Sequence, residues 1–191
     1  MTADTPGRNV RQRAFVAATE LLREEGWEEL SVRAIARRAQ IGASSIYHHF
    51  PNKEALLLRI AVGGFRQLTV AIDRSVENSG ELAPFGAAAR AFLTHVAMQP
   101  ALHDLMFNGA LMSRHQELRD AERETFNAFA GQVKADSRFR PELSISIATT
   151  LWTLGRGMAA TALSHPDREL PEEVRAQIAE GVGYLIERLQ E

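Results

Sequence analysis

The chain has 191 residues, of which 45% are hydrophobic and 24% charged, and its formal net charge is −2, values ordinary for a globular protein of one or two domains. Cysteine is absent, which excludes disulfides and cysteine-ligated metal sites. The N-terminus lacks the apolar core of a signal peptide, and no uncharged apolar run approaches the roughly 18 residues of a membrane span. We therefore expect a cytoplasmic protein with no membrane partner.

The first predicted helix begins near Arg8 and carries an apolar face from Val10 to Leu22 at helical spacing. Gly26 follows two glutamates and is suited to the left-handed backbone that ends many helices. Residues 1–60 hold nine Lys or Arg and seven Asp or Glu, a net charge of +2, whereas the rest holds 13 and 17, a net charge of −4. This mild asymmetry is compatible with phosphate contacts near the N-terminus.

A helix, a turn and a second helix are predicted between residues 31 and 50. Ser31 is a good N-cap for the first of them, and Leu30 with Ile35 fits a hydrophobic staple. The turn falls at residues 40–42, and the helix over 43–50 ends before Pro51, because a residue that precedes proline avoids helical backbone.

The rest of the chain also has helical periodicity, and strand-like alternation is nearly absent. Asn52 can cap the next helix, and Pro171 opens the last one. The expected helices beyond the turn cover residues 53–79, 83–98, 101–108, 111–135, 140–163 and 171–190. The sequence therefore predicts an all-α fold of about nine helices.

The helix over 43–50 has the character of a major-groove reader. Its outward positions Ala43, Ser44 and Ser45 are small and allow close approach, while Ile46 and Phe50 face inward at a spacing of four. Serine hydroxyls can reach phosphates or base edges, and Tyr47 and His48 can reach the DNA backbone or a thymine methyl. Lys53 and the first amides of the following helix suit a phosphate.

The stretch from Val10 to about Leu58 resembles the N-terminal domain of the TetR family of bacterial transcription regulators. The resemblance rests on the helix that ends in Gly26-Trp27, on SVRAIARRAQI, and on SSIYHHFPNKEALL with its Ile-Tyr-x-His-Phe-x-x-Lys pattern. The family's usual turn glycine is Gln40 here, and its usual capping serine is Gly42. We therefore expect Gln40 to adopt left-handed backbone, which is unfavourable for a residue with a side chain.

The resemblance implies roles at matching positions. Arg33 would contact a base or phosphate, and residues 43–45 would face bases. Tyr47, His49 and Lys53 would contact phosphates, with help from Ser31 and the N-terminal arginines. The predicted DNA-binding residues are Arg8, Arg11, Ser31, Arg33, Ala43, Ser44, Ser45, Tyr47, His48, His49 and Lys53.

Simpler interpretations remain for several of these features. A helix-turn-helix can be mere packing in an unrelated all-α protein, and Arg37 with Arg38 can form a solvated face. His48 and His49 are adjacent and point apart on a helix, and His95, His103 and His115 lack metal-ligand spacing, so no metal site is expected.

The C-terminal part is expected to sense a ligand. The stretch 82–129 is rich in Phe, Met and His, which suits an adaptable apolar pocket, although each such residue could equally belong to an ordinary core. The residues we predict for the pocket are Phe65, Phe92, His95, Met98, Met106, Phe107, Met112, His115, Phe126, Trp152 and Arg156.

The segment 151–160 contains the letters G-x-G-x-x-A, but it lies inside a predicted helix and follows no strand, so we reject a dinucleotide site. It also resembles a Trp-x-x-x-His-Gly stretch of one TetR-family subgroup, with Arg156 in place of the histidine. Two apolar stripes could form a two-fold four-helix interface, as in the family. They comprise Leu143, Ile147, Leu151 and Met158, and Val174, Ile178, Val182, Leu185 and Leu189.

We predict a DNA-binding domain over 1–52 and a ligand-binding and dimerisation domain over 53–191. The expected function is a transcription regulator, commonly a repressor, that binds palindromic operator DNA as a homodimer and is released by a small apolar effector. No cofactor is expected. An enzyme is disfavoured because no nucleophile elbow, paired catalytic carboxylates or cofactor loop is found. The alternative is a nucleoid-associated or division factor without a ligand, which a sealed, well-packed interior would favour.

Overall fold

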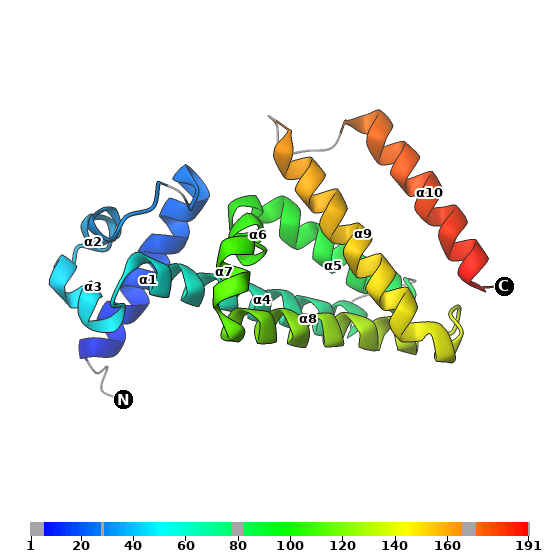
Figure 1. The fold of residues 1–191 in the computed structure, drawn as a ribbon, viewed down its shortest axis with the longest axis horizontal. Coiled ribbons are helices and arrows are strands. Elements are labelled where there is room, and N and C mark those ends of the chain that lie inside the picture. Colours follow the sequence, from blue (N-terminus) through cyan, green and yellow to red (C-terminus); the bar gives the residue numbers. More distant parts are fainter. Residues whose placement is uncertain (1–5, 28, 78–81, 166–170, 191) are drawn as a thin grey trace. The chain divides into compact units, whose positions relative to one another are not determined.

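The computed structural model describes residues 6–27, 29–77, 82–165 and 171–190, and side chains within these ranges from Val10 to Arg188. The described residues form ten α-helices and one 3-10 helix, with no strand among them (Figure 1). The all-α fold class predicted from the periodicity is therefore confirmed.

The helices follow one another with short connections. Their bounds are α1 Pro6–Glu25, α2 Val32–Ala39, α3 Ala43–His49, α4 Lys53–Glu77, α5 Pro84–Met98, α6 Pro100–Met106, α7 Gly109–Arg114, α8 Gln116–Ala135, the 3-10 helix η1 Pro141–Leu143, α9 Ser144–Ser164 and α10 Glu172–Gln190.

One predicted helix is divided in two. The helix expected over 111–135 breaks at His115, whose backbone is extended with φ −120° and ψ 110°. The His115 ring lies 2.7 Å from a carboxylate oxygen of Glu54, and the Arg119 guanidinium donates to the carbonyls of Met112 and Ser113 at the end of α7. The hydrogen bonds from Arg119 satisfy carbonyls that a continuous helix would have paired internally, so the periodic pattern alone could not reveal the break.

The chain forms two compact units. Unit 1 comprises Met1–Gly64 and Ala101–Arg119, and unit 2 comprises Phe65–Pro100 and Asp120–Glu191. The boundary expected at residues 52 and 53 thus falls inside unit 1. Pro51 is a local signal for a helix end, whereas the unit is defined by residues 101–119, which pack with the first part of α4.

Close packing of α4 and α6 within unit 1 depends on Gly64. A Cβ atom added to Gly64 would lie 2.6 Å from the Sδ atom of Met106 and 3.1 Å from a methyl carbon of Leu102. A side chain at this position would force the side chains of Met106 and Leu102 to shift, so glycine allows α4 and α6 to approach closely.

Each unit buries its own core. In unit 1, α1, α2 and α3 pack against one another, with α2 and α3 on the same side of α1 (Figure 1). In unit 2, Phe65, Leu68 and Ile72 of α4 are fully buried. The buried hydroxyl of Thr125 on α8 contacts the Thr69 hydroxyl at 2.8 Å and the Phe65 carbonyl at 3.2 Å. Its polar group is thereby satisfied without a charge.

Helix α4 is long and apolar enough, by length and composition alone, to cross a membrane. Half of its most apolar window is buried inside the protein. In unit 1 its Arg59 lies 3.3 Å from Glu117 of α8. These features are those of a core helix, which satisfies the same test.

Candidate nucleic-acid interface and apolar cavity

Helix α2 begins as the sequence predicts. The Ser31 hydroxyl oxygen accepts a hydrogen bond from the Ala34 amide at 3.1 Å, which caps the helix. Leu30 and Ile35 are both buried, as a hydrophobic staple requires. The Ser31 hydroxyl remains exposed and keeps its proton for donation to a phosphate.

The turn between α2 and α3 has the unusual backbone that was expected. Gln40 has φ 53° and ψ 45°, and it is the one non-glycine residue with positive φ among the described residues. Arg13 of α1 donates to the carbonyls of Ala39 at 2.5 Å and Gln40 at 3.1 Å. This support from α1 stabilises a turn that lacks glycine. Sequence reasoning missed Arg13, because nothing in the local pattern links it to residues 39 and 40.

Helix α3 has two chemically distinct faces. Ile46 is 0% exposed and Phe50, just beyond the helix, is 3% exposed, so both fix α3 within unit 1. Tyr47 is 51% exposed. The other outward residues are exposed or half-buried, and they are Ala43, Ser44, Ser45, His48 and His49. The result is a small, polar surface backed by apolar anchors.

Cationic side chains border this surface. Arg33 on α2 is exposed, Lys53 at the start of α4 is half-buried, and the Arg11 guanidinium lies 6.0 Å from the centre of the Phe50 ring. The side chain of Arg8 lies outside those that the structure describes. At the start of α4, the Asn52 side-chain oxygen accepts from the Ala55 amide at 2.8 Å, so this amide is already satisfied.

Arg38 on α2 binds to α1. Its guanidinium donates to both carboxylate oxygens of Glu24 on α1, at 3.0 and 2.6 Å. These hydrogen bonds lower the pKa of Glu24 below its usual range. Arg38 therefore connects α2 to α1 at the protein surface. This agrees with the expectation that Arg37 and Arg38 form a solvated face and do not read DNA.

The rings of His48 and His49 on α3 contact each other, although adjacent residues on a helix were expected to point apart. The ring centres of His48 and His49 are 5.4 Å apart and the rings meet edge to face. Among the residues that the structure describes, no three His, Asp or Glu side chains gather as metal ligands.

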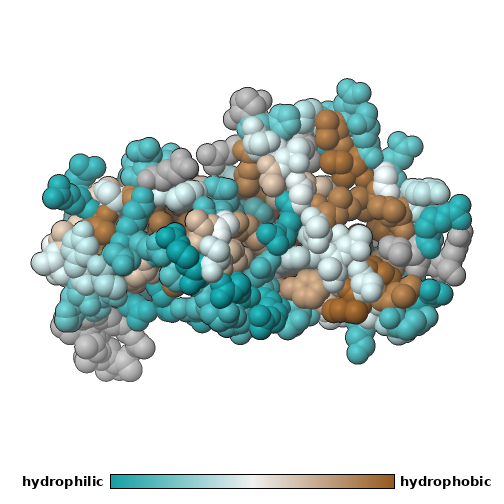
Figure 2. All heavy atoms as spheres, in the orientation of Figure 1, coloured by the Kyte–Doolittle hydropathy of each residue, from teal (hydrophilic) through white to brown (hydrophobic). Residues whose placement is uncertain are grey.

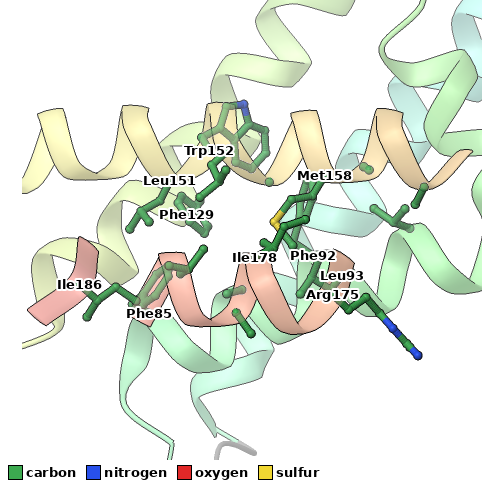
Figure 3. Close-up of a pocket in the computed structure, with 18 of the residues that line it drawn as sticks. Phe85, Phe92, Leu93, Phe129, Leu151, Trp152, Met158, Arg175, Ile178 and Ile186 are labelled. Atoms are coloured by element: carbon green, nitrogen blue, oxygen red, sulfur yellow. The ribbon is translucent and has the colours of Figure 1, made fainter. Parts of the chain in front are cut away.

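A large apolar cavity lies within unit 2 among α5, α8, α9 and α10. Its volume is about 700 Å³, within the range of small-molecule sites. Phe92, Phe129 and Trp152 form an aromatic wall, with ring centres 5.4 Å apart for Phe92 and Trp152 and 5.5 Å apart for Phe129 and Trp152. Figure 3 shows Trp152 at α9 and Phe129 below it, on the side that faces α10, and Figure 2 shows apolar surface gathered between the same two helices.

Two residues predicted for the ligand pocket, Phe92 and Trp152, line this cavity. The others lie elsewhere. Four belong to unit 1, namely Met106, Phe107, Met112 and His115. In unit 2, Met98 is 72% exposed, and the Arg156 guanidinium lies 2.9 Å from Glu122 of α8. The remaining residues are Phe65, which is fully buried, Phe126, whose ring centre lies 6.0 Å from that of Trp152, and His95.

His95 is buried on α5, and its Nε2 atom has no hydrogen-bond partner among the described residues. Burial lowers the pKa of its imidazole, because the charged form is poorly solvated there. A neutral histidine is therefore favoured at this position.

The residues predicted for a dimer interface fall into different environments. Ile147 is 2% exposed and belongs to the core of unit 2, while Leu151, Met158, Ile178 and Val182 line the cavity. Leu143 and Val174 are half-buried, and Leu185 is 47% exposed. The side chain of Leu189 lies outside those described.

Comparisons with known proteins agree with this geometry. A family model described as bacterial regulatory proteins of the tetR family matches residues 15–60, which include α2 and α3. The transcriptional regulator UidR of Escherichia coli K12, described as HTH-type, is 27% identical over 157 residues, which cover 77% of this chain and 76% of UidR. An uncharacterized HTH-type regulator of Mycobacterium tuberculosis H37Rv, Rv1556, is 30% identical over 107 residues, which cover 50% of this chain and 53% of that protein.

Solved structures share the fold. A protein of unknown function from Rhodococcus sp. RHA1 has a TM-score of 0.73 at 24% identity, with 95% of this chain and 96% of that chain covered. A TetR transcriptional regulator from Legionella pneumophila has a TM-score of 0.65 at 19% identity, with 98% of each chain covered.

Proposed function

The chain belongs to the TetR family of bacterial regulatory proteins, and we propose that it is a ligand-responsive repressor that binds palindromic operator DNA as a homodimer. It is a DNA-binding transcriptional regulator rather than an enzyme. The observation that carries the proposal is the contrast on α3 between buried Ile46 and exposed Tyr47. A helix held from behind with a polar outer face can enter a major groove.

The contacts with DNA divide into two groups. Residues Ala43, Ser44 and Ser45 face the bases, where small side chains permit close approach. Tyr47, His48, His49 and Lys53 contact phosphates, with Arg33 on α2 contacting a base or phosphate. Ser31, Arg8 and Arg11 assist at the edge of the site. Phosphate contacts set the position and orientation of α3, whereas contacts with base edges confer sequence preference.

Dimerisation uses α9 and α10. A palindromic operator needs two copies of α3 about 34–36 Å apart, so that both enter successive major grooves. Leu185 and Tyr184 of α10 are exposed apolar residues, 47% and 58% accessible, and they support a role for this helix in pairing.

A ligand sensor is favoured over a nucleoid-associated or division factor. The cavity of about 700 Å³ supports this choice, because a protein without an effector would be expected to fill its interior. An effector that prefers a conformation with a different spacing of the two α3 helices lowers DNA affinity by its differential binding to the two states. The site of action of such a regulator is the cytoplasm.

Selection of binding sites from a random DNA library tests the proposal. We expect two-fold symmetric sites whose half-site centres are about one helical turn, or a multiple of it, apart. A reporter gene placed behind the selected site should be expressed more strongly when this protein is absent. Enrichment of no symmetric sequence would contradict operator recognition, and weaker expression without the protein would identify an activator.

A further inference from the structure

The apolar cavity of unit 2 has two chemically different ends. One end is lined by Phe85, Phe129, Leu151 and Ile186 and is entirely apolar. The other end carries Arg175, the one charged residue among those that line the cavity. Figure 3 shows the Arg175 side chain extending away from the apolar residues, at the end opposite Phe85 and Ile186.

The cavity extends along two helices. Its lining runs from Leu151 to Ala162 on α9 and from Arg175 to Ile186 on α10. Each of these stretches is about 16 Å long at the rise of an α-helix. With a volume of about 700 Å³, a cavity of this length suits a narrow, extended molecule better than a compact one.

The lining also limits the charge that a ligand can carry. Between its two ends, the cavity offers aromatic rings, aliphatic side chains and the small residues Gly155, Ala159 and Ala179. A charge placed there would be desolvated without a partner, at a large cost in free energy. Arg175 is the one charged residue among those that line the cavity, so a negative charge on a ligand is best placed at the end of the cavity beside it.

We propose that this cavity binds an unbranched monoanionic amphiphile, a long-chain carboxylate, with its hydrocarbon chain directed toward Phe85 and its carboxylate beside Arg175. The proposal rests on the proposed function and names the chemical class of the effector. It also assigns Arg175 as the residue that selects anionic ligands over neutral or cationic ones.

Arg175 is already paired within α10. Its guanidinium forms an ion pair with Glu172, one turn earlier, and both side chains are exposed to solvent. A ligand carboxylate must share the guanidinium with Glu172. Removing the negative charge of Glu172 should therefore strengthen binding of a carboxylate, which distinguishes recognition by Arg175 from simple apolar burial.

Binding can be followed through Trp152 in a Trp27→Phe variant, which removes the other tryptophan together with the hydrogen bond from its ring nitrogen to Asp104. Titrations with dodecanoate, dodecanol and dodecyltrimethylammonium, each below its micelle concentration, compare one chain with three head groups. We expect dodecanoate to bind about tenfold more tightly than dodecanol, as for one charge-assisted contact, and the cation to bind weakest. Equal affinities for dodecanoate and dodecanol would overturn the role of Arg175.

Variants locate the site. Arg175→Gln should remove the preference for dodecanoate without changing dodecanol binding, and Glu172→Gln should increase the preference. Ala179→Phe, which places a ring inside the cavity, should weaken all three ligands at least tenfold, whereas Ala176→Phe on the same helix should not, because Ala176 does not line the cavity. Equal effects of Ala179→Phe and Ala176→Phe would overturn the proposed location of the ligand.

Two further measurements separate this inference from the proposed function. In sedimentation experiments, the Ala179→Phe variant should have the same oligomeric state as the unaltered protein. Loss of the dimer in the variant would mean that a second copy of the chain occupies the cavity. DNA binding by the unaltered protein without ligand tests the regulator itself. A protein that binds its operator but shows no change in Trp152 fluorescence with dodecanoate would refute the effector class alone.

Discussion

The DNA-facing surface of α3 and the cavity of unit 2 are built in opposite ways. The α3 surface consists of neighbouring residues on one short helix, and a few buried contacts hold it in place. The cavity is assembled from four helices, and its lining residues are as distant in the chain as Phe85 and Ile186. A substitution on the α3 surface should therefore change DNA contacts alone, whereas the cavity depends on every contact that positions its helices.

The adjacent residues Ile46 and Tyr47 test this difference most strongly. Ile46→Ala should lower the free energy of unfolding by about 2–5 kcal/mol, because a fully buried side chain is lost. Tyr47→Ala should change unfolding by less than about 0.5 kcal/mol but weaken DNA binding. Denaturant unfolding and a DNA titration measure both effects. Unfolding of the Tyr47 variant would mean that this side chain belongs to the core.

Asp136 tests the support of the cavity. Its carboxylate is 1% exposed and accepts from Arg138 at 2.7 Å and from the Phe85 amide, in the first turn of α5, at 3.2 Å. Asp136→Ala should cost about 2–3 kcal/mol, as expected for a buried charged group that caps a helix. Asp73→Ala, at an exposed position of α4, is the control and should be nearly neutral.

The same carboxylate gives a pH dependence. Hydrogen bonds from Arg138 hold the pKa of Asp136 below its usual value, so the unfolded chain takes up a proton first as the pH falls. The stabilisation is complete above about pH 4, near the pKa of an unfolded Asp, and is lost as the pH falls through the lower pKa of the folded state. Thermal unfolding of Asp136→Asn should therefore depend less on pH below about 4 than that of the unaltered protein. Identical acid profiles would contradict this role.

Lys53 tests the phosphate contacts of the DNA-facing surface. Lys53→Ala should weaken binding to all DNA sequences by about 1–2 kcal/mol and reduce the salt slope of binding by about one, because one phosphate contact is lost. The chain has one other lysine, Lys134, on α8 of unit 2, and Lys134→Ala provides a matched control. An unchanged salt slope in the Lys53 variant would remove it from the interface.

The smallest effect is expected at the turn that positions α3. Gln40→Gly should raise the free energy of unfolding by about 1 kcal/mol or less, since glycine adopts positive φ without steric strain. Gln40→Ala keeps the strained backbone and should not stabilise. A loss of stability in the glycine variant would show that the Gln40 side chain contributes more than its backbone costs.

The first three helices were largely readable from the sequence because their signals are local. The Ser31 cap, the left-handed backbone at Gly26 and the inward position of Ile46 each follow from residues a few positions apart. The left-handed backbone at Gln40 was expected from the resemblance, because Gln40 stands where the family has its turn glycine. The periodicity likewise identified the helices of the C-terminal part. It gave no means of placing the break at His115, which depends on contacts with Glu54 and Arg119.

The sequence by itself determined the all-α class and the short helix whose outer face suits DNA, because helical period and capping act over one or two turns. Only the tertiary structure decided which aromatic residues line the cavity, and only it showed that α5 receives its N-terminal cap from Asp136, 51 residues away. Phe and Met residues satisfy the same apolar pattern whether they fill a core or border a cavity. That choice is made by the packing of several helices, which no local pattern specifies.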